Sequence, residues 1–272
     1  MREIFWASFI LSAANYLAAC LLFLAQARRG AGGHVGSGWA PRLLEIGAVL
    51  QLAYLILYSI SDRRCPVFSV HSALGIVSLV GVVSYVVLGR GRRLEALGGF
   101  VAASAAVFLV TARLIAATTP PPSQRWLMAI HITSNLLGGG ILLVAGCASA
   151  FYLLNERRLK ARHVLGQGAK LPPLEALDAV VHRLLWIGLP LLTIGMVTGR
   201  MAIQHAEVIT TGETFRAAVS GASWLLLTAV LVLRQVASWR GRRSAYVTLA
   251  GALGILIVIA LYVARALSGE GP

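Results

Sequence analysis

The hydrophobic positions of this chain gather into eight long stretches, and the polar residues lie mainly in the segments between them. A helix needs about 20 mostly apolar residues to cross the hydrocarbon core of a bilayer, because every backbone polar group must be paired within it. The stretches cover residues 4–27, 43–61, 67–88, 97–117, 126–154, 177–201, 218–237 and 246–267. The pattern predicts an all-α polytopic bundle of about eight transmembrane helices.

Composition agrees with this fold class. Of the 272 residues, 58% are hydrophobic and 12% are charged, whereas soluble domains average about 45–50% and about 25%. No polar segment is long enough to form a separate soluble domain, so residues 1–272 are expected to form a single integral membrane domain. The first stretch lacks the features of a cleaved signal peptide and is expected to be retained.

The 24 lysine and arginine residues are distributed unevenly along the chain. Fourteen lie in the connections after the first, third, fifth and seventh stretches, seven lie at the termini and in the other connections, and three lie within helices. Cytoplasmic loops carry the excess of such residues, so both termini are predicted to lie outside. The net charge of +14 suits anionic lipid on the cytoplasmic face, and no nucleic-acid partner is needed to explain it.

Two connections have informative composition. The run NERRLKARH after residue 154 indicates that the fifth helix extends beyond the membrane, and Pro172 and Pro173 then precede a sixth helix expected to start near Leu174. Glu175 and Asp178 complement the positive end of that helix. The outer connection, predicted over residues 202–217, is long enough to carry function.

Ionisable side chains at membrane depth are costly and mark functional sites by default. Those expected within the stretches are Glu45, His71, Arg113, His131 and His182, with Gln51 and Asn135 as uncharged companions. His71 and His131 both lie about 6–8 Å below the outer face at a rise of about 1.5 Å per residue. Two imidazoles at matched depth can ligate haem iron, and His205 in the outer loop can approach the same side. A hydrogen bond to a neighbouring helix is the structural alternative for each.

His182 lies toward the cytoplasmic end of its helix, directly before Arg183, and cannot share a site with the outer histidines. A ligand role and a helix contact both remain open for it. Glu45 and Arg113 are expected at the membrane interfaces. The glycines at 138–140 are expected to allow close helix packing, and they do not form a nucleotide loop because no strand precedes them.

Four segments carry a family resemblance: RWLMAIHITSN, FYLLNERRLKAR, LPPLEALDAVVHRLLWIGLPLLTIGMVTGR and SWRGRRSAY. In this order they resemble the bacterial cytochrome c assembly membrane proteins of the CcsA and HemX type, most strongly over residues 125–264. The resemblance implies a helix bundle in the bacterial cytoplasmic (inner) membrane that handles haem. It also implies a haem-ligand role for His131, and His182 resembles a histidine of the HemX-like branch.

The outer loop departs from the haem-handling members of that family. Those members carry a tryptophan-rich segment with a Trp-Asp-Pro-Lys-Glu core between the helices that correspond to the sixth and seventh stretches, whereas this chain has AIQHAEVITTGETFR. The end of the seventh helix and the last helix also lack the histidines of those members. The chain therefore resembles the shorter HemX-like branch.

The main hypothesis is a haem-related accessory protein of cytochrome c biogenesis, with haem as cofactor and the lipid bilayer, other assembly proteins or haem-synthesis enzymes as partners. A HemX-like regulator of haem synthesis that acts by protein contact without haem is the alternative. A small-solute transporter is disfavoured because no buried carboxylate pair or broken helix is apparent. Enzymatic activity is not expected, since the sequence suggests no nucleophile with a base, metal triad or phosphate-binding loop.

Overall fold

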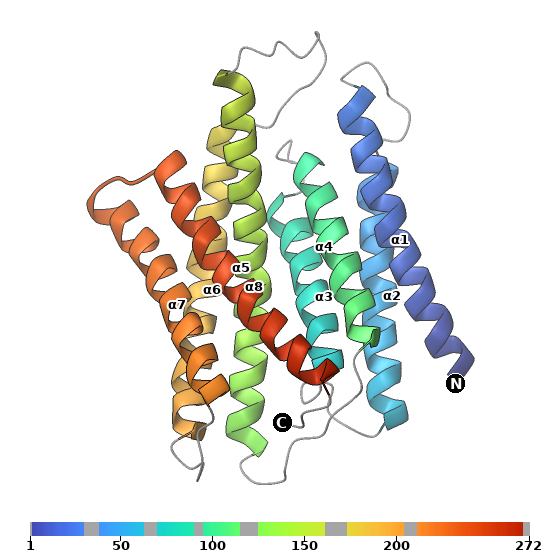
Figure 1. Ribbon diagram of the computed structural model, residues 1–272. Coiled ribbons are helices and arrows are strands. Elements are labelled where there is room, and N and C mark those ends of the chain that lie inside the picture. Colours follow the sequence, from blue (N-terminus) through green and yellow to red (C-terminus); the bar gives the residue numbers. More distant parts are fainter. Residues whose placement is uncertain are drawn as a thin grey trace.

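The computed structural model describes residues 2–29, 38–62, 70–89, 95–114, 125–160, 173–203 and 211–268. These residues form eight helices: α1 (Arg2–Arg29), α2 (Trp39–Asp62), α3 (Val70–Gly89), α4 (Glu95–Leu114), α5 (Arg125–Lys160), α6 (Leu174–Ile203), α7 (Thr211–Val236) and α8 (Arg242–Leu267). The predicted all-helical bundle is confirmed, and each predicted stretch corresponds to one helix. Successive helices run in opposite directions, so both termini lie at one end of the bundle (Figure 1).

Three helix ends test the predicted connections. α5 continues to Lys160 over 36 residues, about 54 Å at about 1.5 Å per residue, which confirms that the charged run continues the fifth helix; its position beyond the membrane stays a prediction. α6 begins at Leu174 as predicted. α7 begins at Thr211, so the prediction of a loop through residue 217 was wrong. Its charged first turns are accommodated because Arg216 is buried with its guanidinium 4.7 Å from the Tyr262 ring centre.

Six helices, α1, α2 and α5 to α8, are long and apolar enough to cross a membrane. The apolar parts of α3 and α4 are shorter, over residues 72–87 and 97–112, so their complete crossing stays a prediction. Large aliphatic side chains point outward on many helices; Leu21, Val49 and Val87 are 66%, 68% and 71% exposed. Such a surface needs lipid around it. The chain is therefore a multi-pass membrane protein.

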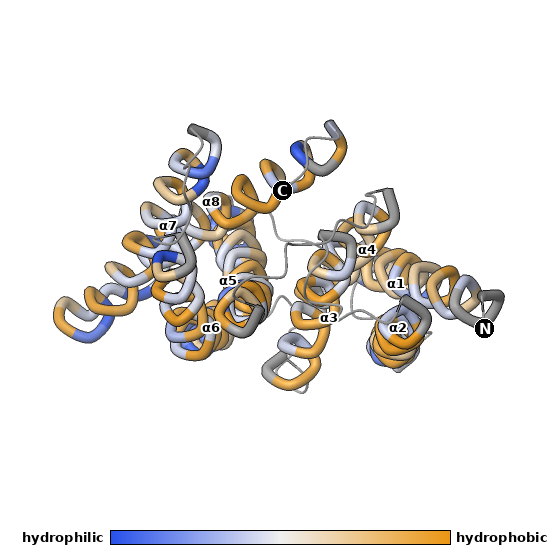
Figure 2. The backbone as a smooth tube through the Cα atoms, turned by 90° about the horizontal axis from the view of Figure 1, so that it is seen from below, coloured by the Kyte–Doolittle hydropathy of each residue, from blue (hydrophilic) through white to orange (hydrophobic). Residues whose placement is uncertain are grey.

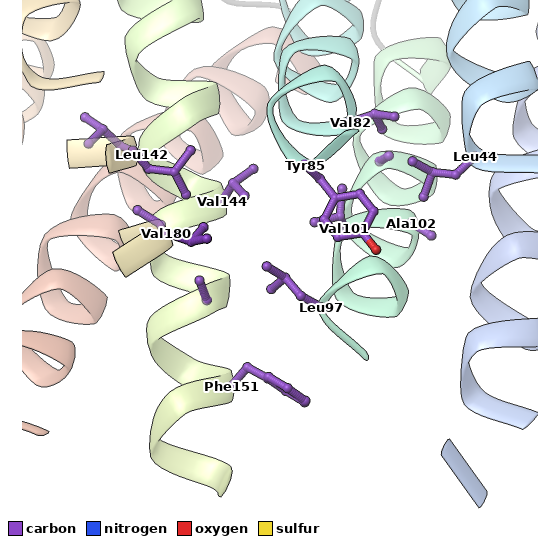
Figure 3. Close-up of a cluster of buried hydrophobic side chains, with 14 of the residues drawn as sticks. Leu44, Val82, Tyr85, Leu97, Val101, Ala102, Leu142, Val144, Phe151 and Val180 are labelled. Carbon is purple, nitrogen blue, oxygen red and sulfur yellow. The ribbon is translucent and has the colours of Figure 1, made fainter. Parts of the chain in front are cut away.

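The helices form two groups, α1–α4 and α5–α8, which are separated in the view along the bundle (Figure 2). Within the first group α1 packs on α2 and α4, and α3 packs on α4; within the second α5 packs on α6 and α8, and α7 packs on α8. The groups meet where α5 packs on α3. Figure 3 shows the apolar cluster there, with Tyr85 of α3, Leu97 of α4 and Val144 of α5.

Glycines 138–140 let three helices approach α5 closely. A Cβ added at Gly138 would lie 2.7 Å from the Leu192 nitrogen of α6, and one added at Gly140 would lie 3.0 Å from a methyl carbon of Val80 in α3. Gly139 faces Ile255 of α8. The close packing predicted for this stretch is confirmed, and it makes α5 the central helix of the bundle.

A buried hydrogen-bond network joins the helices of the first group. The Tyr16 hydroxyl of α1 donates to Gln51 Oε1 of α2 at 2.5 Å, and Gln51 Nε2 donates to the Gly75 carbonyl oxygen of α3 at 2.9 Å. The Ser78 hydroxyl donates to the Ala105 carbonyl oxygen of α4 at 3.0 Å. Gln51, fully buried, has partners at both ends of its amide, so this network accounts for its presence at membrane depth.

Candidate functional site

His131 and Asn135 lie one turn apart on α5 and face two glycines one turn apart on α6. A Cβ added at Gly199 would overlap the His131 ring, and one added at Gly195 would lie 2.6 Å from the Asn135 amide. Only glycine at both positions lets these two polar side chains fit between the helices. The pairing of a His-x3-Asn face with a Gly-x3-Gly face fixes where the imidazole sits.

The hydrogen bonds of His131 define its tautomer. Its Nδ1 lies 2.6 Å from the Gly195 carbonyl oxygen, and because a carbonyl can only accept, Nδ1 carries the proton and donates it. Asn135 Nδ2 donates to the His131 carbonyl oxygen at 2.8 Å. Its 3.1 Å approach to the protonated Nδ1 joins two donors, so it is a packing contact with the ring edge and not a hydrogen bond. Nε2 then carries the lone pair, and it has no hydrogen-bond partner among the described residues.

This arrangement matches that of histidines that ligate metals. Such histidines usually donate the second ring N–H to a carboxylate or a backbone carbonyl, which fixes the tautomer and the ring orientation. Here the Gly195 carbonyl has that role toward His131. α5 begins at the end of the bundle that carries both termini (Figure 1), and His131 is its seventh residue. The geometry leaves Nε2 able to bind an electron-pair acceptor such as a metal ion.

The predicted partner, His71, is the second residue of α3, and its side chain lies outside the described residues. The register of the two helices can still be read. Gly140 of α5 lies beside Val80 of α3, and Val144 of α5 lies beside Gly81 of α3. Neighbouring residues of the two helices therefore differ by 60 to 63 in residue number. Continued to position 71, the same offsets reach residues 131 to 134 of α5. The backbone of His71 is therefore at the level of His131, while their pairing stays a prediction.

His182 is in a different environment. Its Nε2 accepts a hydrogen bond from Trp186 Nε1 at 3.1 Å, and its Nδ1 is buried without a partner among the described residues. It precedes Gly195 by 13 residues on α6, or about 20 Å along the axis, so it does not join His131. Neither nitrogen is presented as an open ligand atom.

His205 and the side chain of Arg113 lie outside the described residues, and the interfacial position expected for Glu45 stays a prediction.

Comparison with known proteins identifies the family. The model of the cytochrome C assembly protein family matches residues 43–269. The chain belongs to this family. The match includes most of α2 and all of α3 and α4, which precede the segment 125–264 where the sequence resemblance is strongest.

Curated relatives of this cytochrome c assembly protein agree. The cytochrome c biogenesis protein CcsA of Guillardia theta is 26% identical over 54% of this chain and 53% of its own length. Protein HemX of Brevibacillus brevis is 26% identical over 58% and 59%, and CcsA of Chlamydomonas reinhardtii is 26% identical over 54% and 40%. The chain thus spans about half the length of the curated relatives that it matches. No solved structure matches it.

Within the described ranges, no three His, Cys, Asp or Glu side chains gather into a metal-ion site. A haem has a smaller requirement, because the porphyrin supplies four nitrogen ligands and the protein adds one or two axial ones. His131 Nε2 is suitable as one such ligand.

Two features of the α5–α8 group were missed from the sequence. The first is the Gly195-x3-Gly199 face, whose spacing in IGMVTGR was a signal for close helix packing. The second is the ion pair between Arg234 of α7 and Asp178 of α6, with 2.6 Å between Nη2 and Oδ2. Arg234 Nη1 also donates to the Ser244 hydroxyl of α8 at 2.7 Å. An arginine inside a predicted membrane helix requires a partner, and that requirement was the available signal.

Proposed function

We propose that this cytochrome c assembly family member is a non-catalytic haem-binding accessory protein of cytochrome c biogenesis, with His131 Nε2 as an axial ligand near the outer face of the bacterial inner membrane. The observation that carries the proposal is the hydrogen bond from His131 Nδ1 to the Gly195 carbonyl oxygen. It fixes the tautomer that haem iron requires and leaves Nε2 without a partner among the described residues.

Several residues would prepare the ligand before haem binds. The Gly195 carbonyl holds the Nδ1 proton and increases the electron density on Nε2. Gly199 leaves the space that the ring occupies, and Asn135 supports the ring edge. His71 is the candidate second axial ligand, because the helix register brings its backbone to the same level. Haem supplies the iron centre that cytochromes c carry, and the chain supplies its orientation in an apolar surrounding.

The test is an absorption spectrum of the full-length protein purified from cells with ample haem. The wild type should show the Soret band of histidine-ligated haem, and His131→Ala should lose it. His182→Ala is the matched control, since it removes a histidine of the second helix group whose nitrogens are not presented as ligands. His71→Ala should change a bis-histidine spectrum to a five-coordinate one. A wild type that is colourless and takes up no added haem would overturn the proposal.

The regulator of haem synthesis is the second candidate. It is favoured by the similarity to protein HemX of Brevibacillus brevis and by the outer segment AIQHAEVITTGETFR, which contains no tryptophan. A protein without haem, in a deletion strain with normal cytochrome c but an altered haem content, would support regulation through protein contact.

A further inference from the structure

A strongly basic cavity lies at the turn between α7 and α8, away from the His131 site. It has a volume of about 430 Å³ and is lined by Ala237, Ser238, Trp239, Arg240, Arg242 and Arg243. The cavity is shallow and open to the surface, unlike the enclosed clefts of most small-molecule sites. The turn lies at the end of the bundle opposite both termini (Figure 1), which is the arginine-rich end predicted to be cytoplasmic.

The turn is held in place by backbone contacts. Ala237 and Trp239 each donate a backbone N–H to the Leu233 carbonyl oxygen, at 2.9 and 3.2 Å, which closes the end of α7. Ser238 and Gly241 adopt left-handed φ values of 51° and 71°. The Gly241 N–H donates to Asp178 Oδ1 at 3.2 Å, so the turn is also fixed to α6. The arginines are therefore presented from a fixed backbone.

The nearby carboxylates do not neutralise Arg240 and Arg243. Asp178 forms its ion pair with Arg234. Glu156 of α5 pairs with Lys160 at 2.6 Å and lies 3.9 Å from Arg242 Nε. Among the described residues no carboxylate lies within 4 Å of the Arg240 or Arg243 side chain, and both are exposed. Two guanidinium groups thus remain available for an anion.

Apolar and aromatic groups lie directly beside the charge. Arg243 lies 6.0 Å from the Trp239 ring centre, and Arg242 lies 5.5 Å from that of Tyr246. Val236, at the end of α7, is 81% exposed. Tryptophan and tyrosine prefer the headgroup level of a bilayer, and an exposed valine at that level favours contact with acyl chains. The occupant should therefore carry both a negative phosphate and an apolar tail.

From this combination we infer that the α7–α8 turn is a specific site for the headgroup of an anionic phospholipid of the cytoplasmic leaflet. Arginine binds phosphate oxygens through paired N–H donors, and basic pockets between membrane helices on this side suit acidic headgroups. Arg240 and Arg243 bind the phosphate, while Trp239 and Val236 contact the glycerol and acyl regions. The inference is independent of haem binding.

The test measures phosphatidylglycerol binding to the full-length protein by native mass spectrometry, with phosphatidylcholine as the neutral lipid. The wild type should retain one phosphatidylglycerol in preference to phosphatidylcholine, and the double variant Arg240→Gln/Arg243→Gln should bind it at least tenfold more weakly. The control double variant Arg42→Gln/Arg183→Gln removes two exposed charges, near the starts of α2 and α6 at the same end of the bundle, that do not line the cavity. It should bind within about twofold of the wild type.

Two results would overturn the inference. Equal weakening in both double variants would mean that the lipid responds to general surface charge and not to this site. Displacement of the lipid by an equal concentration of inorganic phosphate would make the site one for free anions. The phosphate competition is made on the wild type, so it remains decisive even where a variant folds poorly. Loss of lipid binding with an intact Soret band would leave the haem proposal standing.

Discussion

The two helix groups treat a polar side chain at membrane depth in opposite ways. In α1–α4, Gln51 is fully buried, and both ends of its amide have partners on neighbouring helices. In α5–α8, His131 has one nitrogen held by a carbonyl of α6, and the other has no partner among the described residues. Both residues look alike in the sequence, as a polar position in an apolar stretch. The completeness of their hydrogen bonding separates a structural role from a candidate ligand role.

The two helix groups also differ in what the packing of their helices holds in place. In the first group the polar centre holds four helices together, so its loss should reduce stability. In the second group the glycine face of α6 positions one ring, so its change should affect ligand binding first. Each of the following substitutions is chosen to alter one of these properties while leaving the other intact.

The largest effect is expected for Gln51→Leu. It leaves the buried Tyr16 hydroxyl without the acceptor to which it donates, and it removes the second hydrogen bond of the Gly75 carbonyl, which keeps its bond within α3. One orphaned buried group costs about 1–3 kcal/mol, so we expect a loss of about that size in the free energy of unfolding. Thermal unfolding in detergent, followed by tryptophan fluorescence, should show a clearly lower midpoint. Haem bound per folded molecule should not change.

The control for this prediction is Gln51→Leu combined with Tyr16→Phe, which removes the orphaned hydroxyl together with its partner. The double variant should recover part of the lost stability, since replacing both polar partners by apolar groups costs less than removing one. A Gln51→Leu protein as stable as the wild type would contradict the structural role. Haem loss from its folded fraction would contradict the separation between the two groups.

The next effect is expected for Gly199→Ala. The added Cβ overlaps the His131 ring, so the ring must leave the position in which Nδ1 donates to Gly195. We expect at least a tenfold loss of haem affinity, or about 1.4 kcal/mol, measured by titration of the purified protein with haem. Gly221→Ala in α7 is the matched control, because its Cβ would meet nothing within 4 Å. An affinity that is equal in both variants would show that the glycine face does not position the ligand.

The fold was largely predictable because lipid imposes a simple rule on sequence. All backbone groups must pair within the helix, so apolar length alone located every helix. The start of α7 was predicted seven residues too late because its first turns carry Glu213 and Arg216 and are less apolar than a spanning segment, although Arg216 is covered by Tyr262. The candidate site was predicted only in part. His131 was identified by its depth, but the Gly195 carbonyl that fixes its tautomer belongs to a different helix, 64 residues away, and a backbone carbonyl has no signature in the sequence.

The smallest effect is expected for Asn135→Ala. The Asn135 amide donates to the His131 carbonyl oxygen within the same helix and contacts the ring edge at Nδ1. Its removal leaves the bond from Nδ1 to Gly195 in place, so the ring keeps its tautomer and loses only lateral support. Polar contacts of this kind in membranes contribute about 0.6 kcal/mol, which corresponds to a two- to threefold weaker affinity for haem.

The measurement is a haem titration of Asn135→Ala, precise to within twofold and compared with that of Gly199→Ala in the same detergent. The two affinities decide how far the position of the His131 ring depends on each contact. If Asn135→Ala weakens haem as much as Gly199→Ala does, then the amide and not the glycine face determines the position of the imidazole. The small effect is therefore informative, because it separates the contact that sets the tautomer from the one that only steadies the ring. It also extends the comparison of the two helix groups, since Asn135, unlike Gln51, bonds within its own helix and can be removed with little loss of stability.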